Sequence, residues 1–123
     1  MTLKRIARLC GVVIMVLLVI AALGPADWAP RSSLGWQFDH FAGYFVITCI
    51  FCFAWSRPVV VGAFLMAVAA LLEALQALTP DRSANFVAAC CGAGGALAAA
   101  MLWEFIIRTR RRPTGLAAGG KEG

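Results

Sequence analysis

Four long apolar stretches, separated by short polar segments, dominate the chain. They cover about residues 6–24, 39–56, 59–78 and 86–107. A helix that crosses a bilayer needs about 20 mostly apolar residues. The first, third and fourth stretches meet this length directly, and the second meets it with polar residues at its ends. We therefore predict an all-α polytopic membrane protein whose four transmembrane helices form a compact bundle.

The first stretch follows basic residues, a pattern that it shares with signal peptides. Lys4, Arg5 and Arg8 lie at its start, and small residues such as Ala21 and Ala22 near its end suit a cleavage site. The apolar region of a signal peptide usually has about 7–15 residues, and this stretch is longer. We therefore expect a retained transmembrane helix rather than a cleaved leader.

Basic residues fall mainly on one side of this four-helix arrangement. That side carries Lys4, Arg5, Arg8, Arg57, Arg108, Arg110, Arg111, Arg112 and Lys121. The other side carries Arg31 and Arg82. Because cytoplasmic segments of membrane proteins are enriched in Lys and Arg, we expect both termini to be cytoplasmic. The chain is then a multi-pass protein of the cell inner membrane.

Composition and charge agree with this class. Of the 123 residues, 62% are hydrophobic and 14% are charged, whereas about a quarter of the residues of a soluble domain are charged. We expect residues 1–107 to form one transmembrane domain and residues 108–123 to form a basic and then disordered cytoplasmic tail. Topology and contact with anionic membrane lipids account for the net charge of +5, so no nucleic-acid partner is expected.

The cysteines lie inside the apolar stretches. They are Cys10, Cys49, Cys52, Cys90 and Cys91. A C-x-x-C pair such as Cys49 and Cys52 is typical of redox or metal chemistry in soluble proteins, but no His or acidic residue stands beside it at ligand spacing. We therefore expect all five cysteines to be packing residues, with no metal and no cofactor.

The last apolar stretch carries small residues at every fourth position. Ala88, Gly92 and Ala96 belong to one such row, and Gly95 belongs to a second row beside it. Small residues let helix backbones approach closely in lipid. We expect this helix to be the packing centre of the bundle, in contact with at least two others. A homodimer seam or a contact with a membrane protein partner is the competing use of the same stripe.

Polar residues from three separate segments fall in the outer third of the predicted membrane. They are Asp39, His40, Tyr44, Glu73, Gln76, Arg82 and Asn85. His40 and Tyr44 share one helix face, as do Glu73 and Gln76, because residues three or four apart are neighbours on a helix. The opposite half of the bundle has Glu104, which Arg108 pairs at i+4. This one-sidedness predicts a polar pocket that opens outward.

Glu73 is the most informative member of this group. It lies about six residues, or roughly 9 Å, inside its helix. A charged residue at the centre of a membrane helix costs about 2.5–3.5 kcal/mol on insertion scales, so such a residue is functional or paired by default. In the structural alternative, Glu73 pairs with Arg82 or His40 and Gln76 bonds across helices. Ser83 and Asn85 are the candidate N-caps of the following helix.

Two segments resemble the VanZ-like family of small membrane proteins. The segment DHFAGYFVI (39–47) is similar to the family's HFxxY motif, and LLEALQALTPDRS (71–83) is similar to its ExxQ motif with the Pro and Arg that follow. A glycine-rich last helix, here with Gly92, completes the pattern. Departures are Trp36 and Gln37 in place of an acidic–basic pair, Asn85 in place of an aspartate and Ala89 in place of an asparagine. The resemblance implies an integral membrane protein of the bacterial cell envelope.

Three hypotheses about function follow. The first is an outward-facing pocket for the headgroup of a membrane lipid or a lipid-linked envelope precursor, in which Arg82 and His40 meet an anionic group and Glu73 orients them. The second is a structural or accessory subunit of a membrane complex. The third is a small membrane enzyme with Glu73 as general base, which the absence of a nucleophile at the outer surface disfavours. The aromatic loop around Trp28 is expected to cover the pocket or to anchor in the headgroup region.

Overall fold

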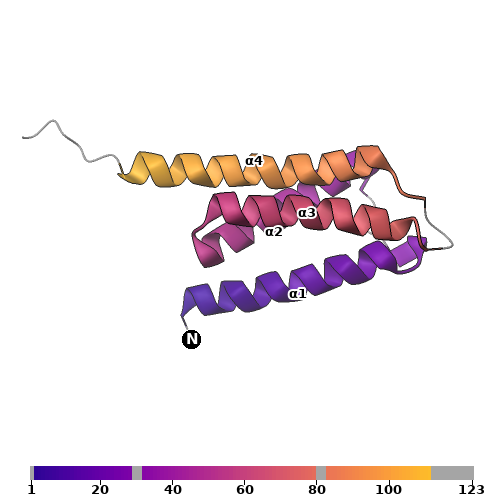
Figure 1. Cartoon of the computed structure of the whole chain (residues 1–123). Coiled ribbons are helices and arrows are strands. Elements are labelled where there is room, and N and C mark those ends of the chain that lie inside the picture. Colours follow the sequence, from indigo (N-terminus) through magenta and orange to yellow (C-terminus); the bar gives the residue numbers. More distant parts are fainter. Residues whose placement is uncertain (1, 29–31, 80–82, 112–123) are drawn as a thin grey trace, which may run out of the picture.

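The computed structural model describes residues 2–28, 32–79 and 83–111. Its elements are α1 (Leu3–Leu23), a short 3-10 helix η1 (Ala26–Trp28), α2 (Trp36–Trp55), α3 (Pro58–Gln76) and α4 (Phe86–Arg111). Figure 1 shows the four long helices lying side by side along one direction. Within the described residues, four helices are long and apolar enough to cross a membrane. The prediction of an all-α bundle of four potential membrane spans is confirmed.

Three helices are longer than the apolar pattern predicts, and α1 begins at Leu3 rather than at residue 6. α2 begins at Trp36 rather than at residue 39, and α4 continues to Arg111 rather than ending at residue 107. Arginine is a good helix former, and cations near a helix C-terminus interact favourably with its dipole. The predicted ion pair between Arg108 Nε and Glu104 Oε1, 2.8 Å apart, supports this last turn. The predicted tail therefore begins as helix, and residues 112–123 lie outside the described part.

The turn between α2 and α3 sets these helices antiparallel. Ser56 ends α2 in the left-handed conformation, at φ 55°, and its N–H donates to the carbonyl of Cys52 at 2.8 Å. Pro58 then opens α3, where its missing N–H costs nothing because the first N–H groups of a helix have no helical partner. The chain reverses direction within a few residues, as the Arg57–Pro58 segment predicts.

α4 is the packing centre of the bundle. Its contacts with α2 and with α3 are more extensive than the contacts between any other two elements. Its small residues allow this approach. A methyl group added at Gly92 would lie 2.8 Å from Cδ2 of Tyr44, and one added at Gly95 would collide with the backbone carbonyl of Phe41. Ala88 and Ala96 are buried beside them. The stripe is thus covered within the chain by α2 and α3.

α1 is the most exposed helix, and Gly11 is its one residue classed as buried. Near the start of α1, Arg8 Nε donates to the carbonyl of Ala54 at 3.4 Å, and the guanidinium lies 5.6 Å from the centre of the Trp55 ring. At the other end, α1 is bonded to α3 instead, through Gln76 Nε2 and the carbonyl of Ala22, 2.9 Å apart. α1 therefore leans from α2 at one end of the bundle to α3 at the other.

We call these two ends the basic end and the loop end. The basic end holds the start of α1, the α2–α3 turn and the end of α4, and it carries Lys4, Arg5, Arg8, Arg57, Arg108, Arg110 and Arg111. The loop end holds the α1–α2 and α3–α4 connections (Figure 1). The order of the helices therefore gathers the Lys and Arg residues of the described part at one end of the bundle, as the four-helix prediction requires.

Two adjacent glycines of α4 test the close contact with α2. Gly95→Ala should lower the free energy of unfolding by about 1–3 kcal/mol, because the added methyl group overfills a packed site. Gly94→Ala is the matched control, because its methyl group would meet only the Phe41 ring at 3.9 Å. Gly94→Ala should leave stability unchanged or raise it, because alanine favours helix over glycine. Thermal unfolding in detergent micelles measures both, and equal effects would contradict the contact.

Candidate functional site

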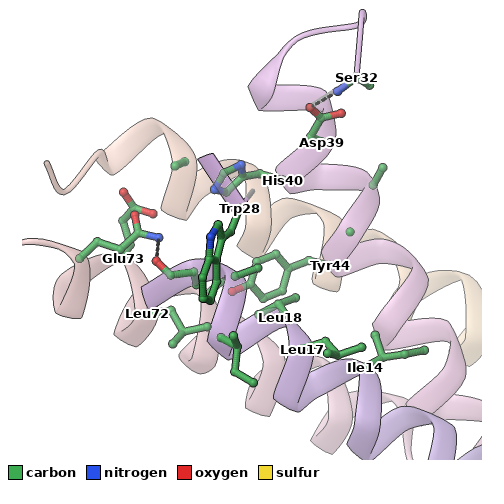
Figure 2. A pocket seen from close by; sticks show the side chains of 18 residues that line it. Ile14, Leu17, Leu18, Trp28, Ser32, Asp39, His40, Tyr44, Leu72 and Glu73 are labelled. Carbon is green, nitrogen blue, oxygen red and sulfur yellow. Dashed lines mark hydrogen bonds between the residues drawn. The ribbon is translucent and has the colours of Figure 1, made fainter. Parts of the chain in front are cut away.

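A pocket of about 780 Å³ lies at the loop end, between α1, α2 and α3. Apolar side chains form most of its wall, among them Leu17 and Leu18 of α1 and Leu72 of α3. Polar side chains from the predicted cluster also line it: Asp39, His40, Tyr44, Glu73 and Gln76. Figure 2 shows Glu73, His40 and Tyr44 around the cavity, with Leu17 and Ile14 deeper along α1. The pocket is therefore amphipathic.

The pocket extends along the helices rather than across them. On α1 its lining runs from Ala22 to Ile14, and on α3 from Gln76 to Ala69. At 1.5 Å per residue these segments are about 12 Å and 10 Å long. This depth is about a third of the roughly 30 Å hydrocarbon core of a bilayer. The polar groups gather toward the loop end and the apolar wall continues inward from them.

Glu73 joins α3 to the start of α4. Its side chain is buried, with the residue 7% exposed, and Oε1 accepts a hydrogen bond from the backbone N–H of Asn85 at 2.5 Å. The side chain of Asn85 in turn accepts the N–H of Val87 at 3.0 Å. Asn85, rather than Ser83, therefore fills the N-cap position of α4. The carboxylate of Glu73 holds this cap against α3.

Gln76 joins α3 to the end of α1. It is buried one turn beyond Glu73, and its Nε2 donates to the carbonyl of Ala22 at 2.9 Å. The last carbonyls of a helix have no helical N–H partner, so this bond satisfies a group that lipid would leave unpaired. Glu73 and Gln76 thus connect α3 to helices on either side. The two hydrogen bonds explain structurally why Glu73 and Gln76 share one helix face, and both side chains also line the pocket.

His40 and Asp39 lie at the start of α2. His40 Nδ1 is 3.0 Å from the carbonyl of Trp36. A carbonyl only accepts hydrogen bonds, so Nδ1 is the donor, and Nε2 is the ring nitrogen that is left to accept one. Asp39 Oδ2 accepts the backbone N–H of Ser32 at 2.9 Å and so fixes the loop that precedes α2. Among the described contacts, no hydrogen bond or ion pair joins His40 to Glu73.

The structure thus brings together most members of the predicted polar cluster. Five of the seven residues named above line the pocket, and Asn85 caps α4 beside it. Arg82, the seventh, lies outside the described residues. The proposed pairing of Glu73 with Arg82 falls outside them too. Gln76 forms a hydrogen bond to another helix, as expected if its role is structural.

Several pocket residues had no signal in the sequence. α1 is apolar on every side, so its pattern does not show that Leu17 and Leu18 face a cavity. Gly43 of α2 also lines the pocket, and a lone glycine in a helix gives no indication of this. Trp28 lines it as well, in agreement with an aromatic loop near the cavity. Figure 2 places its ring among His40, Tyr44 and Leu18.

The prediction that all five cysteines are packing residues is wrong for two of them. Cys52 is buried, and Cys49 and Cys91 are partly buried, but Cys10 and Cys90 are exposed on the outside of the bundle. Lipid is as apolar as a protein interior, so a small apolar side chain gains little by turning inward. No group of three or more His, Cys, Asp or Glu side chains able to hold a metal ion occurs among residues 2–28, 32–79 and 83–111.

No protein-family model, curated protein sequence or solved structure matches this chain. Inference about function therefore starts from the geometry and chemistry of the pocket.

Two substitutions of Glu73 separate its hydrogen bond from its charge. Glu73→Gln keeps an oxygen that can accept the N–H of Asn85, so the free energy of unfolding should stay close to that of the wild type. Glu73→Leu leaves that N–H without an acceptor and should cost about 1–3 kcal/mol. Thermal unfolding in micelles compares the two variants. If Glu73→Gln were as unstable as Glu73→Leu, the negative charge rather than the acceptor would hold the cap.

Proposed function

We propose that this protein binds an amphipathic lipid of the cell envelope within the inner membrane. The observation that carries the proposal is the pocket itself, which combines polar side chains toward the loop end with an apolar wall along α1 and α3. A lipid has the same division between headgroup and chain. The basic end of the bundle favours a cytoplasmic position, so the loop end and the bound headgroup would face outward.

The polar side chains of the pocket favour a headgroup that donates hydrogen bonds. Nδ1 of His40 faces the carbonyl of Trp36, so Nε2 is the ring nitrogen that is left to accept a hydrogen bond. Gln76 uses its amide nitrogen on Ala22, which leaves its oxygen as an acceptor. A hydroxyl group of a glycan or glycerol, or a primary ammonium group, supplies matching donors. The predicted contact of Arg82 with an anionic group would add the phosphate of such a lipid.

The VanZ-like resemblance is part of this proposal. Its two motifs contribute His40 and Tyr44 from α2 and Glu73 and Gln76 from α3, and all four residues line one pocket. Motif residues that are far apart in the sequence thus share one cavity, which supports a common role. The accessory-subunit hypothesis has less support, because the small-residue stripe of α4 is covered by α2 and α3.

Photolabelling with two matched lipids tests the proposal. Phosphatidylethanolamine and phosphatidylcholine, each with the same photoreactive acyl chain, are presented to the protein in nanodiscs. Phosphatidylethanolamine should label residues 14–22 and 39–44 in preference to the outer face of α4. Phosphatidylcholine should label these pocket segments less, because its headgroup has no N–H donor. Unlabelled phosphatidylethanolamine or a glycosyl diacylglycerol should compete, and the better competitor indicates whether the ammonium or the hydroxyl group is preferred.

Peptide mass spectrometry locates the label. The α4 face with Leu97, Met101 and Phe105, all exposed, reports ordinary contact with bulk lipid. Equal labelling of the pocket segments and this face by both probes would contradict a lipid-binding pocket.

A further inference from the structure

Gly43 is a glycine that the packing of the bundle does not require. It lies inside α2, where glycine is less favourable than alanine. A methyl group added at Gly43 would meet no atom within 4 Å, whereas one added at Gly62 or Gly92 would lie 2.6 Å or 2.8 Å from its nearest neighbour. The missing side chains at Gly62 and Gly92 therefore serve helix contact. The missing side chain at Gly43 leaves open space.

That open space belongs to the pocket. Gly43 lines the pocket together with Asp39 and His40, which precede it by four and three residues and so lie one turn nearer the loop end. Gly43 is thus directly inward of the polar groups, at the depth where a bound headgroup would give way to its chain. Across the pocket stand Leu17 and Leu18 of α1.

The same region borders the outside of the bundle. Val46, three residues after Gly43 on α2, is 55% exposed, and Leu17 and Ile20 on α1 are 58% and 47% exposed although both line the pocket. Closer to the basic end the two helices touch, because a methyl group on Gly11 would lie 3.0 Å from the Phe51 ring. α1 and α2 therefore separate toward the loop end, and lipid-facing side chains edge the gap.

We propose that Gly43 keeps open a lateral slot between α1 and α2, through which the acyl chain of the bound lipid passes from the pocket into the bilayer. This inference rests on the proposed lipid-binding function and makes its ligand more specific. The ligand is a chain-bearing lipid that is held by its headgroup and the first part of its chain. A water-soluble headgroup compound would need no opening at this depth.

Side chains introduced at position 43 test the slot. Gly43→Leu should reduce the excess labelling of residues 14–22 by photoreactive phosphatidylethanolamine over phosphatidylcholine roughly tenfold, the size expected when a side chain overfills a site. Gly43→Ala should reduce it less. Since nothing packs on Gly43, both variants should fold, and Gly43→Ala should unfold at the same temperature as the wild type or higher.

Two control variants introduce the same residues, alanine and leucine, away from the pocket. Gly94→Ala matches Gly43→Ala, because its methyl group also enters a helix without a close clash. Ala67→Leu matches Gly43→Leu, because Ala67 is exposed on α3. Both controls should label within about twofold of the wild type, a difference of less than about 0.5 kcal/mol.

The outcomes separate this inference from the function on which it rests. Loss of pocket labelling in Gly43→Leu alone, with both controls unchanged, supports the slot. Pocket labelling that persists at the wild-type level in Gly43→Leu overturns the slot and leaves the lipid-binding pocket standing. Wild-type protein that labels evenly over its lipid-facing surfaces overturns the lipid-binding pocket and the slot with it.

Discussion

Close approach of α4 to α2 and α3 is the contact on which the rest of the structure depends. In lipid there is no hydrophobic force that drives helices together, so association relies on van der Waals packing and hydrogen bonds between them. Gly95 brings α4 against the backbone of α2, and Gly92 lies against the ring of Tyr44 of α2 and the side chain of Ala69 of α3. These contacts fix three helices as one unit. They also fix the direction of Tyr44, whose ring then forms part of the pocket wall.

α1 contacts this unit less extensively than α4 contacts α2 and α3, and the pocket is the consequence. It touches α2 closely at Gly11, and a hydrogen bond from Gln76 holds its other end. Between these two points, α1 and α2 leave a space that neither helix fills. A cavity in the interior of a soluble protein would lose packing energy, but a cavity that opens to lipid can be filled by a lipid chain.

The polar pair on α3 has two roles that are compatible. Glu73 and Gln76 bond to backbone groups of the α4 cap and of the α1 end, and such groups are costly to leave unsatisfied away from water. Both residues also line the pocket. An intramembrane carboxylate is therefore not by itself a sign of chemistry here. A ligand that contacts this pair would meet groups whose positions three helices already determine.

The sequence by itself determined the number of helices, their approximate ends, the separation of the bases and the placement of polar residues near one end. Each of these follows from local pattern, because a bilayer demands long apolar segments and favours charged residues at their ends. The exposure of Cys10 and Cys90 escaped the sequence, because apolarity on every side of a helix does not show which side faces its neighbours. The extension of α4 to Arg111 escaped it too, because the apolar pattern ends at residue 107 and does not show that the basic residues after it continue the helix. Only the tertiary structure showed that Leu17, Leu18 and Gly43 form a pocket with His40 and Glu73. The physical reason is that the tilt of α1, which creates this cavity, is set by close contacts at Gly11 and Gln76 and by no periodicity along the chain.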